Sequence, residues 1–226
     1  MTAASRFDLY SFWRTSATYR VRVALNLKGV EVNEKNINLD TGENLSAAFL
    51  KINPLGAIPA LVDHDANASP LPITQSAAIL EYLEEAFPAV ATLPGDLSGR
   101  ARVRSLAAML TADTHPLLTG RIKKYLVANA SFDDAAWRAW QINWFTVGLQ
   151  AFEARLASEK ETGVFCHGNT PTMADICLAS IIVVMRVFKI DVAAIPHIDR
   201  IMAECEKRPA FAKADPTRQA GAPAAK

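Results

Sequence analysis

Cysteine is scarce in this sequence, with only three in 226 residues. Cys166, Cys177 and Cys205 are odd in number, and none has the C-x-x-C or C-x-x-H spacing of a zinc or redox site. We therefore expect no metal. We interpret the three side chains as reduced, buried thiols of a cytoplasmic protein.

Long hydrophobic runs are also missing. The longest apolar stretch, residues 176–185, is interrupted by Ser180 and is shorter than the roughly 18 residues needed to cross a bilayer. Residues 1–6 are too few and too polar for a signal peptide. These features argue against a membrane protein and predict that residues 176–185 form a core helix.

The sequence has no excess of charge of either sign, since 24 Lys and Arg balance 23 Asp and Glu. The basic residues are dispersed instead of forming a dense run, which argues against a nucleic-acid partner. We expect a small-molecule partner or a second copy of the chain. A chain of 226 residues is long enough for two modest domains, each with its own core.

The segment around Thr15 is the most informative about function. Residues 7–12 predict a short strand and residues 18–28 a helix, with Gly29 as its C-terminal cap. Thr15 and Ser16 then lie at a helix N-terminus, where unpaired N–H groups favour an anion such as a thiolate or a carboxylate. A hydroxyl there can donate to that anion. The alternative is that Thr15 or Ser16 is only an N-cap.

The following segments complete a strand-helix-strand unit. Residues 30–39 predict a second strand, which should run parallel to the first because a helix connects them. Residues 42–51 predict a weaker helix. Pro59 directly precedes an apolar strand, and a cis Ile58–Pro59 bond would leave the N–H and C=O of Ile58 free to pair with an extended ligand. For X–Pro bonds in general, the trans form is much the commoner.

A second helix N-terminus follows. Residues 70–73 predict an edge strand, and Gln75 and Ser76 precede a helical pattern. Ser76 either caps this helix or, with Gln75, offers donors to a ligand carboxylate. Residues 88–95 predict a linker.

From about Ser98 onward, helical periodicity replaces the strand signals. Pro116 should kink the first long helix, because proline lacks an N–H. That kink either presents Asp113, His115 or Arg121 to a ligand, or leaves His115 as a satisfied core histidine. A stripe of tryptophans predicts either core packing or a helix contact, and not a cofactor site: Trp137, Trp140 and Trp144.

Three further signals lie near the C-terminus. Thr172 and Asp175 have the spacing of a capping box at the start of a helix. Arg186, at the end of the apolar helix, is either a partner for a carboxylate or a surface arginine with a buried stem. Residues 214–226, rich in Ala, Pro and Gly, predict a loose tail.

Taken in order, these motifs resemble the zeta class of cytosolic glutathione transferases, which includes maleylacetoacetate isomerase and the bacterial maleylpyruvate isomerases. The matching motifs are residues 13–25, Asn53-Pro54, Ile58-Pro59, Gln75-Ser76, residues 81–85, His115-Pro116 and residues 171–175. The resemblance covers nearly the whole chain and implies an α/β plus all-α fold. It implies a thioredoxin-like glutathione-binding domain over residues 1–87, an all-helical substrate-binding domain over residues 95–213, and a flexible tail over residues 214–226.

The resemblance also implies an enzyme, either a glutathione transferase or a glutathione-dependent cis–trans isomerase of maleylacetoacetate- or maleylpyruvate-type diacids. Thr15 or Ser16 would be the catalytic hydroxyl that stabilises the thiolate of glutathione. The implied glutathione-binding residues are Asn44, Ile58, Gln75, Ser76 and His115. The implied holders of a dianionic substrate are Arg14, Arg121 and Arg186. A homodimer, a cytoplasmic location and a role in aromatic amino acid breakdown are implied as well.

Several positions depart from the family pattern. The family cysteine is replaced by Ala17, and the first family serine by Thr15. The family's polar residues before the cis-proline are replaced by apolar or small ones: Leu55, Gly56 and Ala57. These departures leave open a second hypothesis, in which a non-catalytic or weakly active member keeps the fold and binds an apolar ligand or a protein partner.

Overall fold

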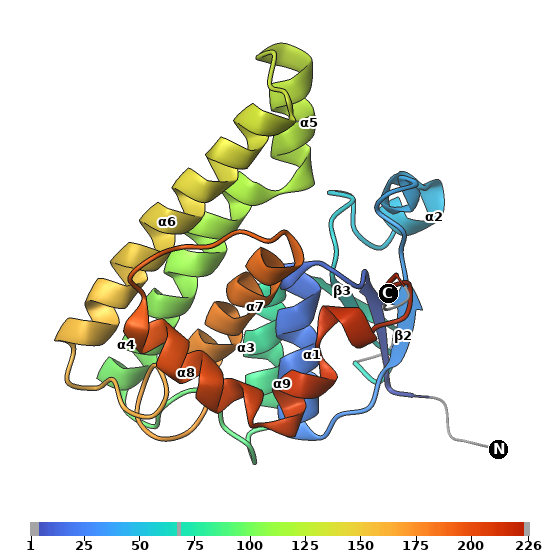
Figure 1. Cartoon of the computed structure of the whole chain (residues 1–226). Coiled ribbons are helices and arrows are strands. Elements are labelled where there is room, and N and C mark those ends of the chain that lie inside the picture. The colour runs from blue at the N-terminus through green and yellow to red at the C-terminus, as the bar shows by residue number, and fades with distance from the viewer. Residues whose placement is uncertain (1–4, 67–68, 224–226) are drawn as a thin grey trace. The chain divides into compact units, whose positions relative to one another are not determined.

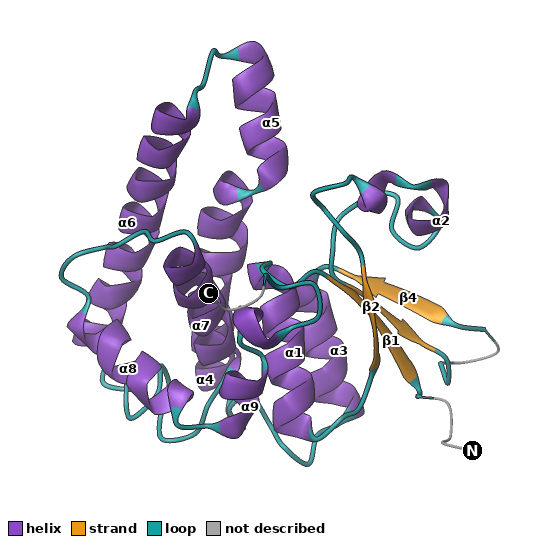
Figure 2. Ribbon diagram, turned by 45° about the vertical axis from the view of Figure 1, so that its right-hand side comes forward, coloured by secondary structure: helices purple, strands orange, loops and turns teal. Residues whose placement is uncertain are grey.

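The computed structural model describes residues 5–66 and 69–223. It divides the chain into two compact units, one formed by residues 1–91 with 208–226 and the other by residues 92–207. The first unit contains the sheet, and the second is helical (Figure 2). The change from the first unit to the second falls within the linker that the sequence predicts.

The first unit alternates strands and helices along the chain. Its elements are β1 (Phe7–Ser11), α1 (Ser16–Lys28), β2 (Asn33–Asn36), η1 (Glu43–Leu45), α2 (Ala47–Leu50), β3 (Ala60–Asp63), β4 (Leu71–Thr74), α3 (Ser76–Ala86), α9 (Pro209–Lys213) and η4 (Pro216–Arg218).

The strands form one mixed sheet in the order β2-β1-β3-β4. β1 pairs in parallel with β2 and antiparallel with β3, and β4 lies at an edge, antiparallel to β3. α1 and α3 pack against each other beside this sheet (Figure 2). The predicted strand-helix-strand unit and the predicted edge strand are therefore confirmed, and the arrangement is thioredoxin-like.

Several predicted boundaries differ from the observed ones; for example, the second strand was predicted over residues 30–39 and β2 covers only Asn33–Asn36. α1 begins at Ser16, two residues before the predicted helix start at position 18. The weak helix predicted over residues 42–51 is split into η1 and α2. The split occurs because Ser46 is extended and its side chain accepts a hydrogen bond from the N–H of Phe49, which starts a new helix.

The C-terminal segment differs more from the prediction. α9 lies in the first unit and packs against α1, where the side-chain amide of Asn26 donates to the carbonyl of Ala210 over 2.9 Å. Ala214 and Pro216 are buried. Residues 208–213 were instead predicted to belong to the helical domain, with a loose tail from residue 214. The last three residues of that predicted tail lie outside the described part of the chain.

The second unit is formed by helices, coloured from green to red in Figure 1. They are α4 (Leu97–Ala108), the π-helical turn η2 (Met109–Thr114), the 3-10 turn η3 (His115–Leu118), α5 (Gly120–Asn129), α6 (Asp134–Ser158), α7 (Met173–Val187) and α8 (Pro196–Glu206). The α-helical hydrogen-bond pattern ends at Ala108, so the predicted disturbance around Pro116 is confirmed and extends over two turns.

The core of this unit is centred on α7, which packs against α4 and α8. As predicted, α7 begins with a capping box: Asp175 accepts hydrogen bonds from the N–H and hydroxyl of Thr172, each over 2.7 Å. Asp175 also accepts from the N–H of Cys166 over 2.8 Å. Cys166, Cys177 and Cys205 are buried and form no disulfide with one another, as expected.

The tryptophan stripe on α6 is also confirmed as a packing feature. Trp137 is buried, and the rings of Trp140 and Trp144 meet edge to face with centroids 5.7 Å apart. The indole N–H of Trp140 donates to the carbonyl of Leu117 over 2.8 Å, which fixes η3 beside α6.

Candidate active site

The N-terminus of α1 carries two hydroxyls that do not cap the helix. Thr15 occupies the N-cap position with extended backbone angles, φ −84° and ψ 130°, but its side chain makes no capping hydrogen bond. Its Oγ1 instead lies 2.6 Å from the Oγ1 of Thr18 and 3.4 Å from the carbonyl oxygen of Phe12. The alternative that Thr15 serves only as a side-chain cap is therefore not supported by the hydrogen bonds.

Ser16, the first residue of α1, is only 3% exposed. Its hydroxyl has no hydrogen-bond partner among residues 5–66 and 69–223. A buried polar group without a partner costs about 1–3 kcal/mol, so natural proteins rarely keep one without a reason. This hydroxyl lies at the positive end of a helix, where an anionic ligand would complete its hydrogen bonding.

A second helix start lies against the first. The guanidinium of Arg20, a residue of α1 that is only 1% exposed, donates through Nη1 to the hydroxyl of Ser76 over 3.0 Å. Ser76 is the first residue of α3, and Gln75 is its N-cap residue. The interpretation of Ser76 as the cap is therefore wrong, because Gln75 occupies that position and Ser76 is already helical.

Gln75 has an unusual backbone conformation, with φ 69° and ψ 114°. Positive φ in a residue other than glycine costs of order 1–3 kcal/mol and is concentrated at functional sites. The side chain of Gln75 is exposed beside the first N–H groups of α3. The strain at Gln75 thus marks the start of α3 as a place where a ligand can bind.

The segment before β3 is a loop that contains a cis proline and is supported by side-chain hydrogen bonds. The Ile58–Pro59 bond is cis. In the part of the chain that the structure describes, no backbone hydrogen bond uses the N–H or C=O of Ile58. The side-chain amides of Asn44 and Asn53 donate to the carbonyls of Gly56 and Ala57, each over 2.6 Å. Asn44, which the sequence analysis assigned to glutathione, therefore supports the loop in this structure.

Asn53, which is almost fully buried, was not among the residues predicted for the site. Its place before Pro54 was the available signal, since asparagine before proline is typical of a turn whose side chain bonds to the backbone. The two asparagine contacts hold the loop without any polar side chain at Leu55, Gly56 or Ala57. The loss of polar residues at these positions therefore leaves the loop ordered.

Arg14 lies beside the start of α1 but is engaged in an ion pair with Asp40. Its guanidinium makes two hydrogen bonds to the carboxylate of Asp40, one of them over 3.0 Å. It also lies over the rings of Phe12 and Trp13, 5.1 and 5.5 Å from their centroids. A substrate carboxylate would have to compete with Asp40 for this cation.

The remaining predicted site residues belong to the second unit. His115 is the first residue of η3 and is partly buried, whereas Arg121 is exposed in the first turn of α5. Arg186 is exposed in the last turn of α7 and pairs with Glu206. These three residues lie on different elements, and the structure links Arg186 to Glu206 instead of to either of the other two.

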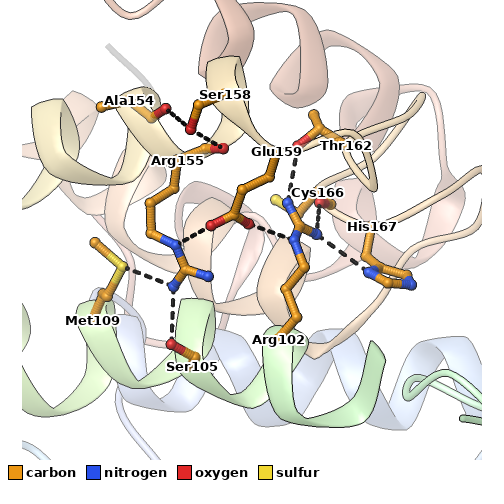
Figure 3. A network of polar contacts seen from close by, with 10 residues as sticks. All are labelled: Arg102, Ser105, Met109, Ala154, Arg155, Ser158, Glu159, Thr162, Cys166 and His167. Carbon is orange, nitrogen blue, oxygen red and sulfur yellow. Dashed lines mark hydrogen bonds and ion pairs between the residues drawn. The ribbon is translucent and has the colours of Figure 1, made fainter. Parts of the chain in front are cut away.

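A polar network that no sequence motif indicated is centred on Arg102 of α4 (Figure 3). Arg102 donates to Glu159, to the carbonyl of Cys166 and to the hydroxyl of Thr162, over 2.5 to 2.9 Å. Burial alone would raise the pKa of Glu159, but hydrogen bonds from Arg155 and Arg102 outweigh it and lower that pKa. Because these charges satisfy one another, we interpret the network as structural.

A cavity of about 330 Å³ opens elsewhere in the first unit. Its lining includes Arg22, Glu34 and Lys213. Arg22 already donates to Glu34 and to the carbonyl of Trp13. The cavity contains none of the predicted site residues, and we do not assign it to the active site.

Residues 5–66 and 69–223 contain neither a metal-binding cluster nor a membrane-spanning helix. No group of three or more His, Cys, Asp or Glu side chains is placed to hold a metal ion there. Within the same residues, no helix has both the length and the apolar character needed to span a bilayer.

Comparison with known proteins shows the family to which this chain belongs. Residues 5–85 match the N-terminal domain of glutathione S-transferase and residues 146–209 its C-terminal domain. The chain is 41% identical to a maleylpyruvate isomerase of Ralstonia sp. over 93% of its own length and 97% of the relative's. A solved holo structure of a maleylpyruvate isomerase, described as a bacterial zeta-class transferase, superposes with a TM-score of 0.89 at 40% identity, covering 96% of this chain and all of the other.

This chain is a zeta-class glutathione S-transferase. The transferase also resembles a solved maleylacetoacetate isomerase from Methylobacterium extorquens AM1 that contains bound malonate and glutathione. That likeness has a TM-score of 0.91 at 44% identity and covers 96% of this chain and 100% of the other. The thioredoxin-like and all-helical parts predicted from the transferase's sequence are thereby confirmed.

Proposed function

We propose that this transferase is a glutathione-dependent cis–trans isomerase of maleylpyruvate- or maleylacetoacetate-type diacids. The observation that carries the proposal is the unpartnered, buried hydroxyl of Ser16 beside the hydroxyl of Thr15 at the start of α1. The similarity to a maleylpyruvate isomerase and to a maleylacetoacetate isomerase supports the same reaction. When bound, glutathione supplies a nucleophilic sulfur that can add reversibly to the double bond of a cis diacid and so allow rotation to the trans isomer.

The residues at the start of α1 fit a bound thiolate. A free thiol has a pKa of about 8.5, so little thiolate exists at neutral pH unless donors stabilise it. Hydroxyl donors at Thr15 and Ser16, together with the N–H groups of the first turn, would lower that pKa. No cysteine is required for this role, so Ala17 does not prevent the reaction.

The other residues of the first unit fit the peptide part of glutathione. The free N–H and C=O of Ile58 suit an extended backbone, and Gln75 with Ser76 would hold a carboxylate at the start of α3. Asn44 would contribute indirectly through the loop that it supports. We assign His115 to glutathione on the resemblance alone.

The arginines would hold the substrate's carboxylates. Arg121 has an exposed guanidinium, whereas Arg14 and Arg186 would each exchange an acidic partner for the substrate. These two ion pairs also favour the second hypothesis, a member of the family with little or no turnover, because they occupy the cations that a diacid needs.

Calorimetric titration with glutathione, followed by an isomerase assay with maleylpyruvate and maleylacetoacetate, tests the proposal. We expect binding and turnover in the native protein, and a loss of turnover in Thr15→Ala or Ser16→Ala. Ser158→Ala is a suitable control, since that exposed hydroxyl donates to carbonyls of its own helix, at Ala154 and Arg155. Binding without turnover would favour the second hypothesis, and the absence of both would contradict the proposed site.

We further propose that the protein is a cytoplasmic homodimer that acts in aromatic amino acid breakdown. The buried cysteines, which form no disulfide with one another, support a reducing compartment. Exposed Leu45, Leu55 and Leu71 offer apolar surface on the first unit for a second copy. Light scattering of the purified chain measures its mass: twice 24.6 kDa supports the dimer, and 24.6 kDa contradicts it.

A further inference from the structure

Thr18 contacts one of the two proposed catalytic hydroxyls, that of Thr15. It is the third residue of α1, its side chain is fully buried, and its Oγ1 lies 2.6 Å from the Oγ1 of Thr15. This distance is at the short end for a hydrogen bond between hydroxyls. One of the two threonines must therefore donate its proton to the other.

The available acceptors decide which threonine donates. Thr18 Oγ1 has no hydrogen-bond partner other than Thr15 among residues 5–66 and 69–223. If Thr15 donated, the buried proton of Thr18 would have no acceptor, which is costly. If Thr18 donates, both atoms are satisfied and the proton of Thr15 is released. The one other acceptor that the described residues place near that proton is the carbonyl of Phe12, whose 3.4 Å separation is too long for a good hydrogen bond.

We propose that Thr18 is a positioning residue that directs the hydroxyl proton of Thr15 toward the sulfur of bound glutathione. The inference rests on the proposed function. It assigns the main donor role to Thr15, since the structure provides no similar partner to orient the hydroxyl of Ser16. A hydroxyl that accepts one hydrogen bond donates a stronger one, so Thr18 also increases the acidity of Thr15.

The test compares variants of the full-length protein by the pH dependence of kcat/KM and by titration of the bound thiolate, followed through its ultraviolet absorbance. Thr18→Val removes the hydroxyl and keeps the shape, and Thr18→Ser keeps the hydroxyl. We expect Thr18→Val to raise the apparent thiol pKa and to lower kcat/KM by about three- to tenfold below that pKa. The loss should disappear at high pH. Thr18→Ser should retain the low thiol pKa.

Two controls separate positioning from folding. Ser180→Ala removes a buried hydroxyl of α7, which donates to the carbonyl of Cys177, and should leave the thiol pKa unchanged. Binding of S-methylglutathione, which has no ionisable thiol, should be equal in Thr18→Val and the native protein. In the Thr15→Ala background, Thr18→Val should cause no further change in thiol pKa, because the two residues act as one unit.

The outcomes distinguish this inference from the proposed function. A Thr18→Val variant with an unchanged thiol pKa, or with an equal loss of kcat/KM at every pH, would overturn the role of Thr18. So would a thiol pKa that depends on Ser16 and not on Thr15. In both cases the native protein would still isomerise the diacid. If the native protein neither binds glutathione nor lowers its thiol pKa, the proposed function itself fails.

Discussion

Arg20 joins the starting points of two helices through a buried hydrogen bond to Ser76. Its Nη1 donates to the hydroxyl of Ser76 over 3.0 Å, so the first turn of α3 is held against α1. The groups proposed to bind the sulfur and the carboxylate of glutathione are thus fixed relative to each other within the first unit. This contact explains why a fully buried arginine stands one turn into a helix that starts at the site.

Removal of the hydroxyl of Ser76 should affect both stability and binding. Ser76→Ala takes away an acceptor from a buried guanidinium, so we expect the free energy of unfolding to fall by about 1–3 kcal/mol. The affinity for glutathione should also fall, because the start of α3 loses a donor. Chemical denaturation and calorimetry measure the two effects, with Ser158→Ala as the control. Unchanged stability together with unchanged affinity would show that the contact does not support the site.

Gly56 should be sensitive to substitution. Its φ is +60°, and an added Cβ would approach a side-chain carbon of Leu45 to 2.9 Å and the carbonyl oxygen of Asn44 to 3.0 Å. We expect Gly56→Ala to destabilise the protein by about 1–3 kcal/mol and to weaken glutathione binding through the loop that Asn44 supports.

Gly42→Ala is the matched control for this substitution. Gly42 also has positive φ, at +78°, but an added Cβ would meet nothing within 4 Å. It should therefore show only the backbone cost, about 1 kcal/mol, with glutathione affinity retained. Equal effects of the two substitutions on affinity would contradict the supporting role of the loop.

Stability should depend on pH through Asp63. Hydrogen bonds from Arg6, over 2.7 and 3.0 Å, are the main cause that lowers the pKa of Asp63 to about 2. Because the folded pKa is below the unfolded value of about 3.9, the ionised carboxylate stabilises the protein above pH 4. This contribution, about 2 kcal/mol, should be lost as the pH falls from about 4 to about 2.

Asp63→Asn tests this dependence. The variant should be less stable than the native protein at pH 7, and the difference should shrink as the pH falls toward 2. Urea denaturation at several pH values between 2 and 7 measures the difference. A difference that stays constant over this range would show that the carboxylate of Asp63 does not titrate as its contacts indicate.

The capping box at the start of α7 should contribute more to stability than the single cap at the start of α6. Asp175 is fully buried and accepts three hydrogen bonds, whereas Asp133 caps α6 at the surface by accepting from the N–H of Ala136 over 2.7 Å. Asp133→Ala should cost about 1 kcal/mol. Asp175→Ala should cost more than about 3 kcal/mol, because it leaves buried donors without a partner. Thermal and denaturant unfolding compare the two, and equal costs would contradict the role given to burial.

The parts of the fold that sequence predicted are those with strong local signals. Thr172 and Asp175 have the fixed spacing of a capping box, and Gly29 follows its helix with the positive φ, +66°, of a C-terminal cap. The apolar run of α7 is long enough to indicate a buried helix. Such features depend on neighbours a few residues apart, so the sequence contains them directly.

The features that sequence did not predict depend on contacts between distant residues. The Asn26–Ala210 hydrogen bond spans 184 residues, and nothing in the composition of the C-terminal segment indicates that α9 packs on α1. The Arg102 network likewise joins residues about 60 positions apart. At the site, the orientation of Thr15 depends on Thr18, and only the coordinates show that the two hydroxyls meet.

The most direct test of the account is an isomerase assay on maleylpyruvate with either glutathione or its thioether S-methylglutathione added. If the start of α1 stabilises a thiolate that acts as the nucleophile, the native protein should produce the trans isomer with glutathione and none with S-methylglutathione. Turnover that is equal with both compounds, or absent with both, would contradict the account.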